Sequence, residues 1–194
     1  MPKIIKDVKL KILNTAHDLF TNNSYENVDI RKIGKECGIA VGTIYNYYSN
    51  KHQLFKAVAI NSWNETLKKL NNVMISDMQI DNKIKSYIEL FFDEISSKNG
   101  IGKQLFRLEL VENNTEIFNH SYFSDINVRI ELQLKELLTH KYGDLTKDIQ
   151  EIDVFIRSLF LLLMRLDSNV DKDMKTKLIV DLIDGYMLKK SDEI

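Results

Sequence analysis

A glycine-centred break between two short helical patterns constrains the fold of this chain more than any other feature of its sequence. The first pattern runs from about Asp29 to Cys37, with Asp29 suited to cap the helix and two isoleucines on one face. Gly38 follows, and glycine readily adopts the left-handed backbone that a tight turn between helices requires. We therefore predict two helices joined by a short turn within residues 24–55.

The second helix, from about Val41 to Tyr48, is too polar and too aromatic for an ordinary core segment. Ile44 and Tyr48 have i,i+4 spacing, so we expect both to point inward. A DNA major groove admits one such helix, and short hydroxyl and amide side chains reach base edges or phosphates from it. The pattern indicates a helix-turn-helix with Val41, Gly42, Thr43, Tyr45, Asn46 and Tyr47 largely outside.

These residues also resemble the TetR family of bacterial transcription regulators. The resemblance covers roughly residues 8–58, and its order and spacing are more specific than a generic helix-turn-helix pattern. It rests on Gly38-Ile39-Ala40-Val41-Gly42-Thr43-Ile44-Tyr45-Asn46-Tyr47-Tyr48, then Ser49-Asn50-Lys51 and Leu54, with Ile12, Leu13, Ala16, Leu19, Phe20, Ile30 and Ile33 upstream. The family pattern differs at Ala40, where a small hydroxyl residue usually caps the second helix, at Gly34, usually alanine, and at Tyr48, usually phenylalanine.

Residues that break helices are scarce in the whole chain. The single proline, Pro2, lies outside any expected helix, and 194 residues include seven glycines. We therefore predict an all-α fold, with a three-helix DNA-binding domain at residues 1–48 and a larger helical domain for ligand binding and dimerisation at residues 49–194. Periodicity places helices at about residues 7–21, 49–74, 84–95, 104–112, 122–142, 147–166 and 173–187.

The segment from Val154 to Leu166 is apolar around most of its circumference, which predicts burial on more than one side. Two such late helices, at about 147–166 and 173–187, fit a two-fold interface, because a symmetric dimer places two heads on a palindrome. The resemblance also implies a four-helix interface there. The alternative is that these helices form the core of the monomer.

The distribution of charge supports a DNA-binding head. The net charge of −1 alone argues against a nucleic-acid partner, but residues 1–56 hold nine Lys and Arg against five Asp and Glu. No apolar run is long enough to span a membrane, and the N-terminus lacks the apolar core of a signal peptide. The single cysteine, Cys37, fits a reducing cytoplasm.

Arg31 opens the first helix of the motif, where it can pair with a guanine edge or contact a phosphate. The resemblance implies DNA contacts for Thr43 and Tyr45, and phosphate contacts for Tyr47 and Lys51. An ordinary solvated surface is the alternative for Arg31 and Lys51. The candidate DNA-binding residues are Arg31, Val41, Gly42, Thr43, Tyr45, Asn46, Tyr47 and Lys51.

Aromatic residues of the larger domain are candidates for a ligand pocket, as the resemblance implies for a regulatory domain. Aromatic residues at helical spacing are also ordinary core residues, so both interpretations stay open. The candidates are Trp63, Phe91, Ile95, Phe106, Leu110, Tyr122 and Phe155.

Catalytic and metal-binding patterns are not found in the sequence. The histidines, His17, His52, His120 and His140, lack the paired spacing of metal ligands. No phosphate-binding glycine loop, nucleophile elbow or zinc pattern occurs. We expect no metal, no cofactor and no enzymatic activity.

The sequence therefore favours a homodimeric, TetR-like repressor that binds a palindromic operator and is released by a small apolar or amphipathic effector. One alternative is a DNA-binding regulator that is controlled by a protein partner. Another is a helical ligand-binding or enzymatic protein whose head is only structural.

Overall fold

The computed structural model describes residues 8–97, 101, 122–146, 149–166 and 169–192, and the regular elements within these ranges are all helices. The chain divides into two compact units. The N-terminal unit contains the described residues up to Trp63 and Ile101, and the C-terminal unit those of Asn64–Ser97 and from 122 onward. The all-α fold is confirmed, whereas the proposed functional boundary between residues 48 and 49 stays a prediction.

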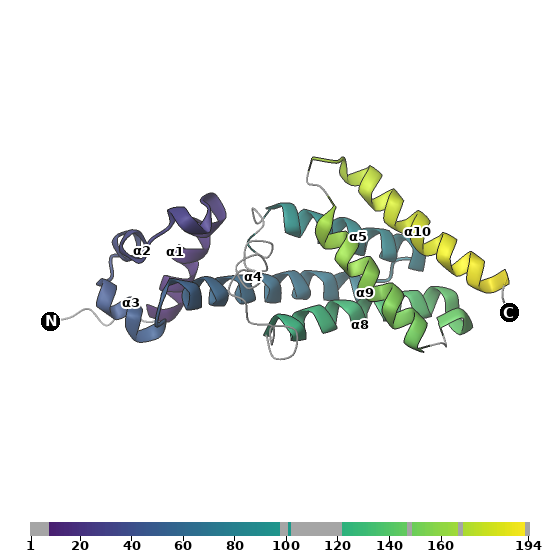
Figure 1. Ribbon diagram of the computed structural model, residues 1–194, viewed down its shortest axis with the longest axis horizontal. Coiled ribbons are helices and arrows are strands. Elements are labelled where there is room, and N and C mark those ends of the chain that lie inside the picture. The colour runs from purple at the N-terminus through teal and green to yellow at the C-terminus, as the bar shows by residue number, and fades with distance from the viewer. Residues whose placement is uncertain (1–7, 98–100, 102–121, 147–148, 167–168, 193–194) are drawn as a thin grey trace. The chain divides into compact units, whose positions relative to one another are not determined.

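The described residues of the N-terminal unit form four α-helices, which Figure 1 shows as α1, α2, α3 and the start of α4. Its elements are α1 (Val8–Asn22), the short η1 (Tyr25–Asn27), α2 (Ile30–Cys37), α3 (Val41–Tyr47) and the first half of α4 (Lys51–Met74). Phe20 of α1 meets Phe55 of α4 edge to face, with ring centroids 4.8 Å apart. The buried residues include Ile12, Ala16, Phe20, Ile33, Cys37, Ile44, Phe55 and Val58.

The helix ends in this unit follow from local sequence. The Asp29 carboxylate accepts a hydrogen bond from the Lys32 amide at 2.7 Å and so caps α2, as predicted. Gly38 has φ 63° and ψ 35°, the left-handed conformation predicted for the turn. The Asn50 side chain accepts from the Gln53 amide at 2.8 Å and caps α4. These two caps and the left-handed glycine between them set the path of the chain from α2 through α3 into α4.

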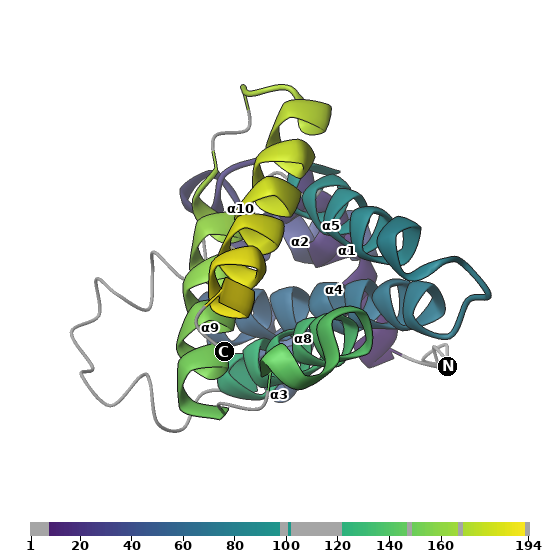
Figure 2. The ribbon, with the colours of Figure 1, turned by 90° about the vertical axis from the view of Figure 1, so that its right-hand side faces the viewer.

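The C-terminal unit contains the end of α4 and four further described helices. They are α5 (Ile80–Ser97), α8 (Tyr122–Tyr142), α9 (Ile149–Arg165) and α10 (Lys172–Asp192), with the short η2 (Gly143–Thr146) after α8. α5 packs against α8 and α10, and α8 packs against α9. α10 lies beside both α5 and α9 (Figure 2). Their buried residues include Tyr87, Ile88, Phe91, Ile130, Leu134, Ile152, Ile156, Ile179 and Ile183.

The predicted helices agree with the observed ones within a few residues, and Tyr122–Tyr142 agrees at both ends. The helix predicted at 104–112 lies outside the described residues. The prediction that the segment from Val154 is buried on more than one side is wrong for a single chain, because Val154 is 64% exposed and Leu161 56%. Ile156 and Leu163 on the opposite side are buried, so α9 covers the core with one face only.

Polar contacts join three helices within the C-terminal unit. The Lys141 ammonium of α8 donates to Asp81 of α5 and to Asp184 of α10, each at 2.8 Å. The Tyr142 hydroxyl donates to the same Asp184 carboxylate. Three helices are therefore joined through one ammonium group. No helix in the described ranges is both long and apolar enough to cross a membrane.

Candidate nucleic-acid interface

Helix α3 has one buried and one exposed face. Ile44 is fully buried and Tyr48 nearly so, as the spacing predicts. On the other face the side chains of Tyr45 and Tyr47 are 48% and 46% exposed. Gly42 and Asn46 are also exposed, as predicted. Val41 and Thr43, which were also predicted to lie largely outside, are half-buried, so that prediction is wrong for these two residues. The buried face fixes the helix on its unit and leaves the polar aromatic face available to a partner.

The turn before α3 holds the two helices of the motif close together. The Ile39 amide donates to the Gly34 carbonyl at 2.9 Å, and a Cβ atom on Gly34 would lie 2.9 Å from the Ile39 carbonyl oxygen. Glycine at this position therefore permits a close approach between α2 and the turn. Ala40 precedes α3 and provides no side-chain cap, because its methyl group cannot accept a hydrogen bond.

Exposed cations surround the motif within the N-terminal unit. Arg31 and Lys32 lie in the first turn of α2, and Lys35 follows one turn later, all three exposed. Lys9 and Lys11 of α1 are exposed as well. Such cations attract a phosphate backbone whatever the base sequence. The prediction that Arg31 contacts DNA is compatible with its exposure and stays a prediction.

Lys51 has an internal role that the sequence did not indicate. Its ammonium donates to the carbonyl oxygen of Tyr25 at 2.7 Å and lies 4.1 Å from the centroid of the Tyr25 ring. That ring is itself 4.9 Å from the ring of Phe55 in α4. Lys51 therefore ties the start of α4 to η1, and its predicted phosphate contact stays a prediction. The two residues are 26 positions apart, so no local pattern pairs them.

Tyr48 has a buried hydroxyl group without a hydrogen-bond partner among the described residues. Burial raises the pKa of this phenol above its ordinary value, because the charged form loses water. The group is neutral at physiological pH and has no evident chemical role. Its ring, in contrast, fills the space beneath α3.

The candidate pocket residues do not share one environment. Phe91 is buried against Phe160 of α9, with ring centroids 6.1 Å apart. Phe155 stacks on Tyr186 of α10 at 3.9 Å. Trp63 is buried and Ile95 half-buried. Phe106 and Leu110 lie outside the described residues, and Tyr122 opens α8 without a described side chain.

Helices α9 and α10 present a common set of exposed apolar side chains: Val154, Leu161, Met174, Leu178, Leu182 and Leu188. The two helices are joined by the Phe155–Tyr186 stack and by the Glu151 carboxylate. That carboxylate accepts from the Tyr186 hydroxyl and the Lys190 ammonium, each at 2.7 Å, and these hydrogen bonds lower the pKa of Glu151. Exposed apolar residues in such number are typical of an interaction surface.

Clusters for metal chemistry are not found in the described part of the chain. No group of three or more His, Cys, Asp or Glu side chains there is placed to hold an ion. The features that stand out are instead the exposed face of α3, its surrounding cations and the apolar face of α9 and α10.

Comparison with known proteins points to the same N-terminal segment. Residues 12–58 match the family described as bacterial regulatory proteins, tetR family. The HTH-type transcriptional regulator UidR of Escherichia coli (strain K12) is 24% identical over 82 residues, 42% of each chain. An HTH-type transcriptional regulator of Staphylococcus aureus (strain USA300) is 37% identical over 54 residues, 28% of this chain and 29% of the relative. The match thus spans less than half the length of either relative.

Solved structures resemble the chain over most of its length. A tetR-family transcriptional regulator from Streptomyces coelicolor has a TM-score of 0.77 at 16% identity, covering 99% of this chain and 85% of that one. The transcriptional regulator FadR from Bacillus subtilis, solved in complex with stearoyl-CoA, has a TM-score of 0.63 at 19% identity, covering 90% and 97%. At these identities the likeness concerns the fold. Residues 12–58 therefore match the helix-turn-helix segment of the tetR family of bacterial regulatory proteins, and the described fold is like that of a TetR-family regulator.

Proposed function

We propose that this protein is a dimeric transcriptional repressor that binds a palindromic DNA operator through α3. The observation that carries the proposal is the division of α3 into a buried face with Ile44 and Tyr48 and an exposed face with Tyr45, Asn46 and Tyr47. The buried face gives the helix a fixed orientation on its unit. The exposed face then meets the base edges of a major groove with aromatic, hydroxyl and amide groups.

The surrounding cations supply affinity that is independent of sequence. Lys9, Lys11, Arg31, Lys32 and Lys35 are exposed on the N-terminal unit and attract phosphates. In this proposal Thr43, Tyr45, Asn46 and Arg31 contact bases, whereas Tyr47 and Lys51 contact phosphates. Such a division is usual, because phosphate contacts position a protein on DNA and base contacts select the sequence.

Dimerisation through α9 and α10 completes the proposal. Their exposed apolar side chains would gain free energy if they were removed from water, and a second copy of the same surface would cover them. Pairing about a two-fold axis gives a four-helix interface and presents two α3 helices to successive major grooves. A palindrome with half-sites about one helical turn apart is the expected target.

The C-terminal unit is proposed to bind a small amphipathic effector. The support is the structural likeness to FadR of Bacillus subtilis, whose structure holds stearoyl-CoA. Release of DNA requires that the effector bind one conformation of the dimer more tightly than the other. Helix α4 contributes residues to both units. We therefore expect a conformational change caused by the effector to reach the N-terminal unit through α4. A regulator of this kind acts in the cytoplasm.

Selection of bound duplexes from a random pool, followed by sequencing, tests the proposal. The purified full chain is incubated with the pool at low and at moderate salt, and retained duplexes are read. The expected result is enrichment of a palindrome whose half-sites are about 10 base pairs apart, centre to centre. No enrichment at either salt concentration would overturn the proposal.

A further inference from the structure

The amide group of Asn46 has no partner within the described part of the chain. The residue is exposed on α3, and its side chain makes no hydrogen bond with any described residue. Other asparagines of the N-terminal unit are engaged. The Asn22 amide donates to the Asp18 carbonyl oxygen at 2.8 Å, and the Asn50 side chain caps α4. The Asn46 amide therefore keeps both its donor and its acceptor available to another molecule.

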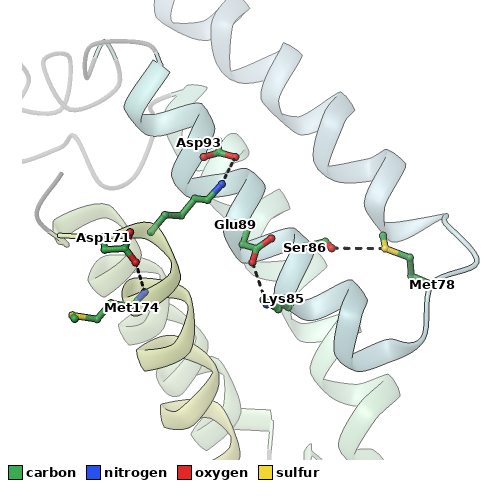
Figure 3. A network of polar contacts seen from close by, with 8 residues as sticks. Met78, Lys85, Ser86, Glu89, Asp93, Asp171 and Met174 are labelled. Atoms are coloured by element: carbon green, nitrogen blue, oxygen red, sulfur yellow. Dashed lines mark hydrogen bonds and ion pairs between the residues drawn. The ribbon is translucent and has the colours of Figure 1, made fainter. Parts of the chain in front are cut away.

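Polar side chains of the C-terminal unit show the usual alternative, which is pairing within the chain. Figure 3 shows it at the contact between α5 and α10, where Asp93 accepts from the Lys172 ammonium at 3.1 Å. Within α5, the Lys85 ammonium pairs with the Glu89 carboxylate at 3.6 Å. Among the described residues, none pairs in this way with a polar side chain of α3. The polar groups of α3 are thus left for a partner.

Gly42 lies one turn before Asn46 on the same exposed face, opposite the buried Ile44. The described glycines with positive φ are Gly38 and Gly143, so the backbone of Gly42 is one that any residue can adopt. A Cβ atom on Gly42 would meet no other atom within 4 Å. Neither backbone nor packing therefore requires a glycine here, although glycine is a poor helix former. What glycine provides is bare backbone that another molecule can approach closely.

The side chains of α3 differ in kind from those that read guanine. The commonest specific contact with guanine is a bidentate pair from arginine or lysine, and α3 contains neither residue. Asparagine instead forms a bidentate pair with N6 and N7 of adenine. A threonine methyl group or an aromatic ring makes an apolar contact with the methyl group of thymine, and Thr43 and Tyr45 carry such groups. The chemistry of α3 therefore favours A·T base pairs.

We propose that α3 reads A·T base pairs at the centre of each operator half-site. Asn46 pairs with one adenine, Thr43 and Tyr45 contact thymine methyl groups, and Gly42 allows the helix backbone to approach the groove closely. A guanine contact from Arg31 would come from α2 and would therefore fall at another position of the half-site. The inference rests on the operator binding proposed above and adds the class of bases that is selected.

The duplexes selected from the random pool test the two proposals separately. The expected result is a palindrome with A·T pairs at the centre of each half-site. A palindrome whose half-sites have G·C pairs there would overturn the base preference and leave operator binding intact. The absence of any enriched palindrome would overturn both.

Modified bases locate the contacts within the selected operator. 7-Deazaadenine lacks the N7 acceptor and deoxyuridine lacks the thymine methyl group, whereas both keep Watson–Crick pairing. At one adenine of each half-site, the 7-deaza base should weaken binding by about tenfold, as expected for a lost bidentate contact. Deoxyuridine at a neighbouring thymine should weaken binding to a smaller extent. The same bases placed outside the half-sites are the control and should change nothing. No response at any adenine of the half-site would overturn the proposal.

Asn46→Ala assigns the adenine contact to its residue. The variant should bind the unmodified operator and the 7-deaza operator with equal affinity, because the group that meets N7 is gone. Asn72→Ala is the matched control, since Asn72 is exposed on α4 in the C-terminal unit, and it should retain the full effect of the modified base. A full effect in a folded Asn46→Ala protein would overturn the assignment.

Gly42→Ala separates the contact with DNA from the stability of the fold. Alanine is the better helix former and its methyl group has room, so the midpoint of urea unfolding should rise or stay unchanged. Operator affinity should instead fall by about tenfold, the value of one lost base contact, because the methyl group would stand between α3 and the groove. A merely structural role would move both quantities in the same direction. Unchanged affinity in Gly42→Ala would overturn the close approach at this turn.

Discussion

The Lys51 ammonium donates a hydrogen bond to the Tyr25 carbonyl at 2.7 Å and lies over the ring of the same tyrosine. One side chain thereby joins the first turn of α4 to η1. The ring of Tyr25 continues the contact to Phe55, so the charged group rests on an aromatic cluster of the N-terminal unit. A residue expected to contact DNA thus also stabilises the unit that presents α3.

Replacement of Lys51 by alanine should therefore have two effects. The free energy of unfolding should fall by about 1 kcal/mol, the usual net value of such a hydrogen bond. The salt dependence of operator affinity should become shallower by about one unit of slope, because one phosphate contact is lost. Urea unfolding measures the first effect, and titrations at several salt concentrations measure the second.

Lys68→Ala is the control for the Lys51 variant, since Lys68 is exposed on the same helix but belongs to the C-terminal unit. It should change neither quantity. A destabilised Lys51→Ala protein with an unchanged salt slope would contradict the phosphate contact and leave Lys51 a purely internal role.

Tyr45→Ala should weaken binding to the selected operator by about tenfold or more, because a lost base contact is worth roughly 1–3 kcal/mol. Stability should change by less than about 0.5 kcal/mol, as expected for an exposed residue. Fluorescence anisotropy and thermal unfolding give the two values. Undiminished affinity in a folded, dimeric Tyr45→Ala protein would show that this face of α3 does not contact DNA.

The local features of the N-terminal unit were predictable because each depends on a few neighbouring residues. The Asp29 cap, the left-handed Gly38 and the inward Ile44 follow from residue type and spacing alone. The end of α8 at Tyr142 is equally local, since Gly143 follows it with φ 53°. In these places local preference and global fold agree.

Contacts between distant segments were not predictable in the same way. Lys51 with Tyr25 and Phe155 with Tyr186 depend on how helices cross, and helical periodicity assigns a face without naming the partner. The exposed face of α9 illustrates the same limit. Its sequence indicates apolar residues around most of the circumference, but only the fold of the chain decides which of them the chain itself covers.

Tyr48→Phe should leave stability unchanged or raise it by up to about 1 kcal/mol, because it removes a buried hydroxyl group without a described partner and keeps the ring. Tyr87→Phe is the matched control. Tyr87 is fully buried, and its hydroxyl donates to Gln133 at 3.0 Å, so the same change should cost about 1 kcal/mol. A clear loss of stability in Tyr48→Phe would indicate that its hydroxyl is bonded.

Leu178→Glu and Leu182→Glu should each convert the proposed dimer into monomers, because each places a charge in the proposed interface between α9–α10 pairs. Light scattering after size-exclusion chromatography gives the mass, which should fall to that of one chain. Operator affinity should fall with it. Ile75→Glu, at an exposed apolar residue after α4, is the control and should remain dimeric. If both variants remain dimeric, the interface lies elsewhere.

Stability should fall in acid through Asp184. Burial pushes the pKa of this carboxyl upward, but the hydrogen bonds from Lys141 and Tyr142 outweigh burial and hold it below the ordinary value. Because the folded-state pKa is depressed, the stabilisation is present above the unfolded value of about 3.9 and is lost as pH falls below it. Urea unfolding at fixed protein concentration, from pH 7 to 3, should therefore show a smaller loss in Asp184→Asn. Asp181 is exposed on the same helix, so Asp181→Asn is the control and should lose stability in acid as the unmodified protein does. If Asp184→Asn also loses as much stability between pH 7 and 3 as the unmodified protein, the assignment to Asp184 is contradicted.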